Sequence, residues 1–362
     1  MLARENHTAY NFMYLSTSRL HRERANLIQT LLTFQAISQK EPSSLLIMPP
    51  HALKISIEKR LSQLGLFHKI NIKTSGLLHS RWKKWRYWPF FFFYKKKLLT
   101  SNVFVRTPRL SLSLINFNIP HVLELHELSK VKEDDRLIIT LKKGAYSGLL
   151  RKIVVISRSL KKELLHLGFL EKDISIIRSG VNFKTFSSSV PLSKEKLKKP
   201  IVVHVGTINK ERGADILLYL AQKGIKVIVA GSGAESLKHE NIENLGIIPH
   251  NAVPSIYNRG NIAVIPYQKE LGTVDSFSSL KLMEAMASGR VVIASDLPPI
   301  RELIEHKKNG LVIPPSDPQK WFKAVQSIVK QPELGISLCH KAQKKAREFD
   351  WFNRAEKIIA LY

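Results

Sequence analysis

Residues 278–296, SSLKLMEAMASGRVVIASD, constrain the fold of this chain more than any other segment. The spacing of Leu280, Met283 and Ala287 places apolar side chains on one side of a helix, and Gly289 supplies the left-handed residue at which helices often end. The apolar, β-branched run that follows is typical of an interior parallel strand. The segment therefore predicts a helix-to-strand step of a doubly wound sheet, in which the start of the helix offers free backbone N–H groups to an anion, typically a phosphate.

Length and composition favour a globular protein with two domains. The 362 residues exceed the size at which one core usually suffices, and 44% of them are hydrophobic and 24% charged. The single cysteine, Cys339, allows no internal disulfide, and residues 1–10 lack the layout of a secretory signal. No stretch of about 20 uninterrupted apolar residues is present, so we expect a cytosolic chain without a transmembrane helix.

The positive charge is concentrated in the first part of the chain. The formal net charge is +28, of which residues 1–200 carry +23 and residues 201–362 carry +5. An excess confined to one half indicates a surface that faces an anionic partner.

The densest part of this excess is residues 81–97, RWKKWRYWPFFFFYKKK, with seven cationic and nine aromatic residues and no acid. Trp and Tyr prefer the lipid headgroup level, Phe enters the acyl boundary, and Lys and Arg are attracted by an anionic leaflet. The segment is too short and too charged to span a bilayer, so we predict peripheral contact with an anionic membrane surface. The expected contacts are Trp82, Trp85, Trp88, Phe91 and Lys95. Two alternatives remain: a core helix flanked by solvated lysines, and a nucleic-acid-binding segment, which we do not expect because no such motif occurs elsewhere.

The first half also alternates between strand-like and helical patterns, which predicts a second α/β unit. Short apolar runs occur at residues 10–15, 45–48, 103–106, 122–125 and 153–156. The polar, basic stretch 187–200, SSSVPLSKEKLKKP, is bounded by proline and indicates a linker.

Five segments after this linker resemble, in order, the donor-binding domain of the family 4 retaining glycosyltransferases. They read IVVHVGTINKERGADILL, VIVAGSG, NLGIIPHNAVPSIYNRGNIAVIPY, SSLKLMEAMASGRVVIASDLPPIREL and KNGLVIPPSDPQKW. Five such segments are far more specific than one glycine-rich motif. The resemblance implies an α/β chain with the GT-B fold, two Rossmann-like doubly wound parallel-sheet domains that face a central cleft. The implied boundaries are 1–190 for the acceptor-binding and membrane-facing domain, 191–200 for the linker, 201–341 for the nucleotide-sugar-binding domain, and 342–362 for a helix that returns to the first domain.

The first half resembles the same family less extensively. The segment RERANLIQ matches a subgroup in which an Arg-Ala-Asn sequence starts the first helix, and this implies that Arg24 and Asn26 lie at the acceptor site or cleft. Both residues equally suit a solvated helix cap. In PHVLELHEL, His126 follows an apolar strand, and the family places a histidine there beside the donor sugar, which makes it the candidate catalytic residue. Glu127 is expected to face the cleft.

The resemblance assigns donor binding to the second half. The loop GTINKERG, with Thr207 and Arg212, resembles the phosphate-binding loop, although relatives commonly carry Arg where Thr207 stands. Glu284 matches the second of a glutamate pair, on the ribose, whereas Ser276 stands where relatives carry the first. Lys281 is expected to bind phosphate, with a solvated surface lysine as the alternative. The remaining expected donor contacts are Gly231, Ser278, Ser279 and Leu280.

The implied activity is transfer of a hexose-type sugar with retention of configuration, from a nucleotide-diphosphate sugar to a lipid-linked or cell-surface polysaccharide acceptor. The expected location is the cytosolic face of the membrane, to which the protein binds peripherally. No metal-ligand cluster is visible in the sequence, so we expect a metal-independent reaction without a cofactor, in which the enzyme mainly positions substrates and stabilises the leaving diphosphate. Two alternatives stay open: the same donor chemistry on a soluble acceptor, and an inactive protein that keeps the fold and binds nucleotide.

Overall fold

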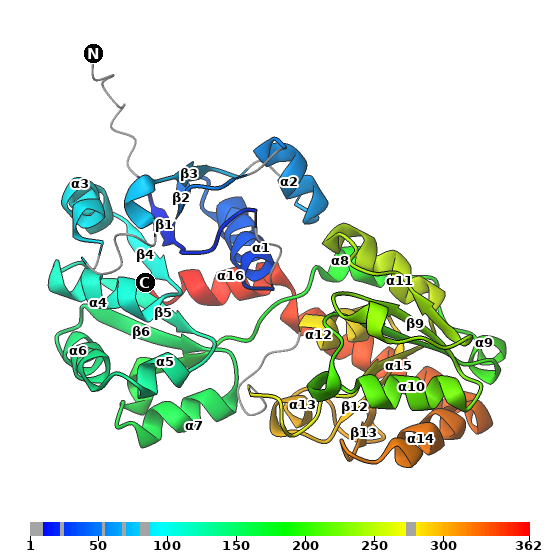
Figure 1. Cartoon of the computed structure of the whole chain (residues 1–362). Coiled ribbons are helices and arrows are strands. Elements are labelled where there is room, and N and C mark those ends of the chain that lie inside the picture. Colours follow the sequence, from blue (N-terminus) through cyan, green and yellow to red (C-terminus); the bar gives the residue numbers. More distant parts are fainter. Residues whose placement is uncertain are drawn as a thin grey trace. The chain divides into compact units, whose positions relative to one another are not determined.

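The computed structural model divides the chain into two compact units, each built around one parallel sheet (Figure 1). The first unit comprises residues 1–62, 66–178 and 352–362, and the second comprises 63–65 and 179–351. The structure describes residues 10–21, 25–52, 55–66, 70–79, 85, 87–272 and 280–362. The prediction of an α/β chain with two doubly wound parallel-sheet domains is confirmed.

The sheet of the first unit has the strand order β3-β2-β1-β4-β5-β6-β7 within the described residues, with all neighbours parallel. The strands are β1 (Phe12–Leu15), β2 (Ser44–Met48), β3 (Ile72–Thr74), β4 (Asn102–Val105), β5 (His121–Leu125), β6 (Leu150–Val155) and β7 (Ile174–Ile176). The helices are α1 (Ala25–Lys40), α2 (Ile57–Gln63), α3 (Trp88–Leu99), α4 (Pro108–Asn116), α5 (Ser129–Lys132), α6 (Asp135–Tyr146), α7 (Arg158–His166) and α16 (Trp351–Ile359).

The side chains of β1 pack on both faces of the sheet, because successive side chains of a strand point to opposite faces. Met13 and Leu15 belong to the core that contains residues of α3, α4, α6 and α7. Phe12 and Tyr14 face the other way, where the ring of Tyr14 packs against Phe34 of α1 and that of Phe12 against Tyr362. The carboxyl terminus of the chain therefore completes the core of the first unit.

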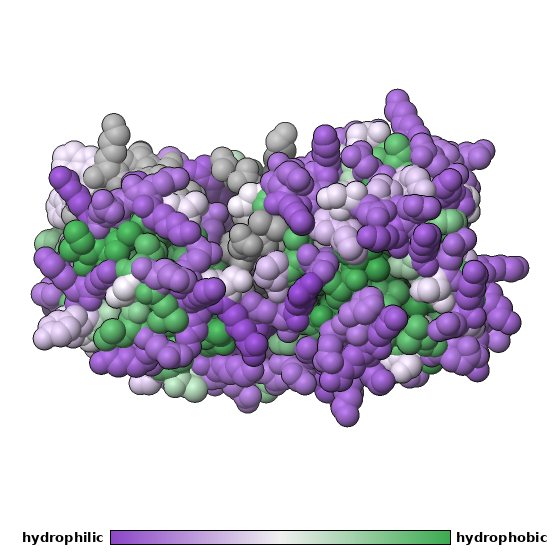
Figure 2. All heavy atoms as spheres, turned by 90° about the horizontal axis from the view of Figure 1, so that it is seen from below, coloured by the Kyte–Doolittle hydropathy of each residue, from purple (hydrophilic) through white to green (hydrophobic). Residues whose placement is uncertain are grey.

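The second unit repeats this design with the strand order β10-β9-β8-β11-β12-β13. The strands are β8 (Ile201–Val205), β9 (Lys226–Ala230), β10 (Ile242–Asn244), β11 (Ile262–Ile265), β12 (Val291–Ser295) and β13 (Leu311–Ile313). The helices are α8 (Phe183–Ser187), α9 (Lys194–Lys198), α10 (Ala214–Gln222), α11 (Val253–Arg259), α12 (Leu280–Ala287), α13 (Pro298–Arg301), α14 (Pro318–Lys330) and α15 (Pro332–Ala346). Figure 2 shows a mainly hydrophilic surface with separate apolar patches on each unit, as expected for a chain with a net charge of +28.

Two boundaries differ from those expected from the sequence. The first unit ends at residue 178, not 190, and the expected linker 191–200 contains α9, whose Leu197 is fully buried in the core of the second unit. The lysines around Leu197 make the segment look like a linker, yet Leu197 is buried and the Asn261 side chain donates to the carbonyls of Lys196 and Lys199. The return to the first unit also starts later than expected, because α15 stays in the second unit and residues 352–362 cross back.

Two buried histidines make the stability of both units dependent on pH. The His121 Nδ1–H donates to the Ile119 carbonyl at 3.0 Å and its Nε2 accepts from the Ser111 hydroxyl at 2.6 Å, whereas the His204 Nδ1–H donates to the Val264 carbonyl at 2.9 Å. Burial lowers the pKa of His121 to about 4 and, with a smaller contribution from Lys281, that of His204 to about 3. Both imidazoles are therefore neutral in the folded protein at pH 7.

We predict that the protein loses stability on acidification from pH 7 to pH 5. Below about pH 6.5 the unfolded chain protonates these histidines and the folded chain does not, so each contributes a loss of about 1.4 kcal/mol per pH unit. Thermal unfolding measured across this range should give a steeper pH dependence for wild type than for His121→Gln. The control His340→Gln, which changes an exposed side chain, should keep the wild-type slope; equal slopes for all three proteins would contradict the prediction.

Candidate functional site

The loops that follow β8, β9 and β10 meet at the carboxyl edge of the second sheet. The Gly206 N–H donates to the Ala230 carbonyl and the Gly231 N–H donates to the Gly246 carbonyl, both at 2.7 Å. A Cβ atom placed on Gly231, which has a φ of 139°, would lie only 2.1 Å from the Gly206 carbonyl oxygen. Glycine is therefore required where these loops contact each other.

Lys281, in the first turn of α12, places its ammonium group against this junction. A Cβ atom on Gly206 would lie 2.1 Å from Lys281 Nζ, so the lysine occupies the space that the glycine leaves open. Its Nζ lies 5.3 Å from the centroid of the Tyr267 ring, and its carbonyl accepts a hydrogen bond of 3.1 Å from the Tyr257 hydroxyl. These contacts hold a cation over the loop after β8.

Arg212 contributes a second positive charge near the same edge. It ends the 3-10 turn η4 (Lys210–Arg212), and the Asn209 side chain fixes that turn by accepting the Arg212 backbone N–H at 2.9 Å. The pKa of His204, at the end of β8, is lowered by burial first and then by Lys281 and by Arg212. Because both cations act on the same buried ring, positive charge gathers at the carboxyl end of β8.

Glu284 lies on the next turn of α12 and is almost completely buried. Its Oε1 accepts a hydrogen bond of 2.8 Å from His250 Nε2, in the loop after β10. Burial raises the pKa of Tyr257, and the Glu284 carboxylate raises it further. The site thus combines a carboxylate, cations and converging loops, the groups that a nucleotide diphosphate needs for its ribose and its phosphates.

The other expected donor contacts have different outcomes. Thr207 is exposed and its Oγ1 accepts a hydrogen bond of 3.2 Å from the Ser232 hydroxyl, so it joins the loops after β8 and β9. Leu280 is the half-buried first residue of α12. Ser278 and Ser279 lie outside the described residues.

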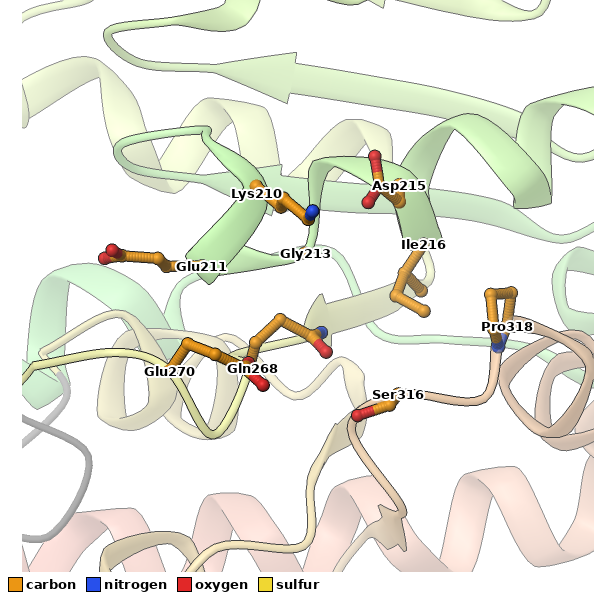
Figure 3. A pocket seen from close by; sticks show the side chains of 9 residues that line it. All are labelled: Lys210, Glu211, Gly213, Asp215, Ile216, Gln268, Glu270, Ser316 and Pro318. Atoms are coloured by element: carbon orange, nitrogen blue, oxygen red, sulfur yellow. The ribbon is translucent and has the colours of Figure 1, made fainter.

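A cavity of about 520 Å³ lies beside the same loop and has the opposite electrostatic character (Figure 3). It opens at the starts of α10 and α14 and at the loop after β11. Its lining residues are Lys210, Glu211, Gly213, Asp215, Ile216, Gln268, Glu270, Ser316 and Pro318. With three carboxylates and one lysine it is unsuited to a diphosphate.

In the first unit, His126 follows β5 and bonds to a buried carboxylate. Its Nε2 is hydrogen-bonded to Glu124 Oε1, which also accepts from Arg354 Nη2 of α16 at 2.6 Å. Burial and, after it, the charge of Arg106 lower the pKa of His126 to about 4. The imidazole is one-fifth exposed and neutral at pH 7.

The expected acceptor residues are placed only in part. Asn26 is exposed in the first turn of α1, and its carbonyl accepts from Arg106 Nη1 at 2.8 Å. Glu127 is exposed beside His126 in the sequence. Arg24 lies outside the described residues.

The aromatic segment forms one buried and one exposed face of α3. Phe90, Phe91 and Leu98 pack in the core of the first unit, so the expected membrane contact of Phe91 is wrong. The exposed side is here named the aromatic surface, and its residues are Trp85, Trp88, Phe92, Phe93 and Leu99, exposed by 46 to 71%. Lys95 is exposed on the same helix, and Trp82 lies outside the described residues.

Sequence reasoning missed two polar partners of the expected residues. His250 lies within one of the five segments that carry the family resemblance, but it was not singled out there, and its role appears only through its bond to Glu284. Arg354 lies 230 residues from Glu124, and no local pattern joins them. Within the described part of the chain, no group of three or more His, Cys, Asp or Glu side chains is placed to hold a metal ion, and no helix is long and apolar enough to cross a membrane.

Comparison with known proteins finds a family match within the second unit. Residues 199–331 match the family Glycosyl transferases group 1. An uncharacterized glycosyltransferase of Haemophilus influenzae is 27% identical over 265 residues, which cover 69% of this chain and 70% of that protein. Matches to the next two curated relatives cover only 50% and 59% of those proteins.

Solved structures extend the likeness to the whole chain. Anabaena HepE in complex with UDP is 14% identical, has a TM-score of 0.72, and is matched over 97% of this chain and 98% of that one. The lipopolysaccharide outer core galactosyltransferase WaaB is 13% identical, with a TM-score of 0.66 and coverage of 96% and 99%. At these identities the likeness shows the fold, which is GT-B.

We predict that Gly231→Ala destroys the junction of the loops after β8 and β9. The added methyl group would collide with backbone, which cannot move aside as a flexible side chain would, and we expect a loss of roughly 2 kcal/mol or more of stability. Urea unfolding would measure it. Gly224→Ala is the matched control, since Gly224 also has a positive φ but open space around it. If both variants lose the same stability, the steric argument for Gly231 is wrong.

Proposed function

Because residues 199–331 match the family Glycosyl transferases group 1 and the chain has the GT-B fold, we propose that this protein is a glycosyltransferase. It moves a hexose-type sugar from a nucleotide-diphosphate donor to a lipid-linked or cell-surface polysaccharide acceptor, at the cytosolic face of a membrane. The observation that carries the proposal is the position of Lys281 Nζ against Gly206, one helical turn from the buried Glu284.

The donor binds to the second unit through its diphosphate and its ribose. Lys281 and Arg212 neutralise the phosphates, and backbone N–H groups around the start of α12 add dipoles of the favourable sign. The Glu284 carboxylate accepts hydrogen bonds from the ribose hydroxyls, and His250 holds one of its oxygens in place. The structure of Anabaena HepE in complex with UDP supports this choice of ligand.

The transfer retains the configuration at the anomeric carbon and uses no metal. The bond between that carbon and the phosphate oxygen breaks, the acceptor hydroxyl oxygen bonds to the carbon on the same face, and the hydroxyl proton passes to the departing phosphate. Cations at the diphosphate stabilise the charge that develops there. The protein then needs no strong base and mainly positions the two substrates.

The acceptor is presented at a membrane, to which the aromatic surface of α3 binds. Trp and Phe side chains exposed by 46 to 71% are costly in water and favourable at a lipid interface, and the lysines of the last turn favour an anionic leaflet. The lipopolysaccharide outer core galactosyltransferase WaaB has the same fold.

We predict that one class of nucleotide sugar raises the melting temperature. UDP-, GDP-, ADP- and dTDP-sugars would be compared by thermal shift, because a ligand that binds only the folded state stabilises it. Lys281→Ala and Glu284→Gln each remove a charge-assisted contact and should weaken binding roughly tenfold to a hundredfold.

The control for this experiment is Lys226→Ala, which removes an exposed lysine at the amino end of β9, the opposite edge of the sheet. It should bind as wild type does. Wild-type affinity in Lys281→Ala would contradict the donor site. If no nucleotide sugar stabilises wild type, donor binding is contradicted altogether. The alternative of an inactive protein that binds nucleotide is then contradicted as well.

We also predict that the wild-type protein sediments with vesicles that contain anionic lipid. Replacing Trp85, Trp88, Phe92 and Phe93 with Ser should abolish sedimentation and leave the nucleotide-induced thermal shift unchanged, because these residues lie in the other unit. The control replaces Val190 and Ile247, two exposed apolar residues of the second unit, with Ser. Retained sedimentation of the four-residue variant would contradict the aromatic surface as the membrane contact, whereas no sedimentation of wild type would favour a soluble acceptor.

A further inference from the structure

The carboxylate between His126 and the C-terminal helix is the most deeply buried charge near the proposed catalytic residue. Only 1% of the Glu124 side chain and 3% of the Arg354 side chain are exposed. Burial would raise the pKa of Glu124, but the charge of Arg354, followed by His126 and Arg106, holds that pKa below its ordinary value. Glu124 is therefore an ionised carboxylate inside the first unit.

An ionised carboxylate can only accept hydrogen bonds, and this determines which nitrogen of His126 carries the proton. Since Glu124 Oε1 faces His126 Nε2, the hydrogen must be on Nε2. The imidazole is neutral, so Nδ1 keeps a lone pair. No described residue is a hydrogen-bond partner of Nδ1, and the ring is partly exposed.

Arg354 is held in place by further hydrogen bonds besides the one to Glu124. Its Nη1 donates to the carbonyls of Ile177 and Arg178, both at 3.1 Å, and its Nε donates to the Thr33 hydroxyl at 3.3 Å. In Figure 1, α16 lies beside α1, which carries Thr33. The guanidinium thus links the end of the chain to α1, to the segment after β7 and to Glu124.

The other charged and titratable groups facing this pair do not replace Arg354. Arg106 is held by α1 through Asn26, Thr30 and Gln29. Burial, with Glu124 as a smaller cause, raises the pKa of Tyr14 above its ordinary value, so its hydroxyl stays neutral. The second carboxylate oxygen, Glu124 Oε2, has no partner among the described residues.

We propose that Arg354 is a positioning residue for the glycosyl transfer reaction: through Glu124 it fixes His126 with the proton on Nε2, so that Nδ1 accepts a hydrogen bond from a substrate hydroxyl. The inference rests on the proposed function for the identity of that substrate, a sugar or its acceptor. It gives one side chain of the C-terminal helix, Arg354, an indirect role in the reaction. Without the guanidinium, Glu124 is a buried carboxylate without its main counter-ion, which favours its protonation. A protonated carboxyl donates to Nε2, and the proton of the imidazole moves to Nδ1.

The test compares wild type with Arg354→Met and Arg354→Lys. Protein labelled with ¹⁵N at histidine reports which ring nitrogen of His126 is protonated, and His126→Asn identifies the signal. We expect protonated Nε2 in wild type, loss of that state in Arg354→Met, and partial recovery in Arg354→Lys, which restores the charge but not the fork of donors. With a donor found in the thermal-shift screen, kcat should fall roughly tenfold to a hundredfold in Arg354→Met, with an unchanged nucleotide-induced shift.

Two further variants separate positioning from a general loss of structure. Glu356→Gln breaks another polar tie of α16 to α1, the 2.6 Å ion pair with Lys40, and should keep the wild-type signal and rate. Glu124→Met removes the acceptor of the Nε2–H and nearly keeps the length of the buried side chain, so it tests the link if Arg354→Met does not fold; the wild-type tautomer in Glu124→Met would overturn the proposal.

The outcomes for Arg354 and for the proposed function are distinct. A protonated Nε2 with wild-type kcat in Arg354→Met overturns the inference, as does a protonated Nδ1 in wild type. The nitrogen signals need no substrate, so an absence of transfer activity with any donor would contradict the proposed function while the measured tautomer would still decide the role of Arg354.

Discussion

The steric contact between the loops after β8 and β9 governs the second unit. A Cβ atom on Gly231 would collide with the Gly206 carbonyl, and the space beside Gly206 is filled by Lys281. The close contact leaves no space between the two loops for a ligand. A ligand must instead lie across them, where Lys281, Arg212 and Glu284 are presented from fixed elements.

The first unit depends on a buried ion pair, whereas the second depends on close backbone contact between two loops. Glu124 would be unstable in its buried position without Arg354, and Arg354 is supplied by the last helix of the chain. This explains why residues 352–362 belong to the first unit although the preceding helices belong to the second. The chain end therefore contributes more than apolar contacts: it provides the counter-ion that lets a carboxylate lie beneath His126.

Patterns along the sequence predicted the helices and strands, which depend on neighbouring residues. The helix and strand of residues 278–296 follow from spacing, and α12 and β12 confirm them over the described residues. Phe91 and Phe92 cannot be distinguished by such a pattern, because the phase of α3 is set by the core into which Phe90 and Phe91 pack. Residues 194–198 look like a linker because a single buried leucine leaves no periodic signal. The bond between Glu124 and Arg354 spans 230 positions and only the folded chain reveals it.

The loop 206–213 separates two surfaces of opposite charge, and this difference limits where an anion can bind. Lys281 and Arg212 act on the end of β8, whereas Glu211, Asp215 and Glu270 line the cavity beside the same loop. A diphosphate in the cavity would be repelled by the carboxylates and would bind less favourably. Near Lys281 and Arg212 it would be attracted and would bind more favourably. In a chain with a net charge of +28, attraction alone would bind anions at many places. The acidic residues beside the loop therefore disfavour an anion in the cavity, while the cations favour it at the end of β8.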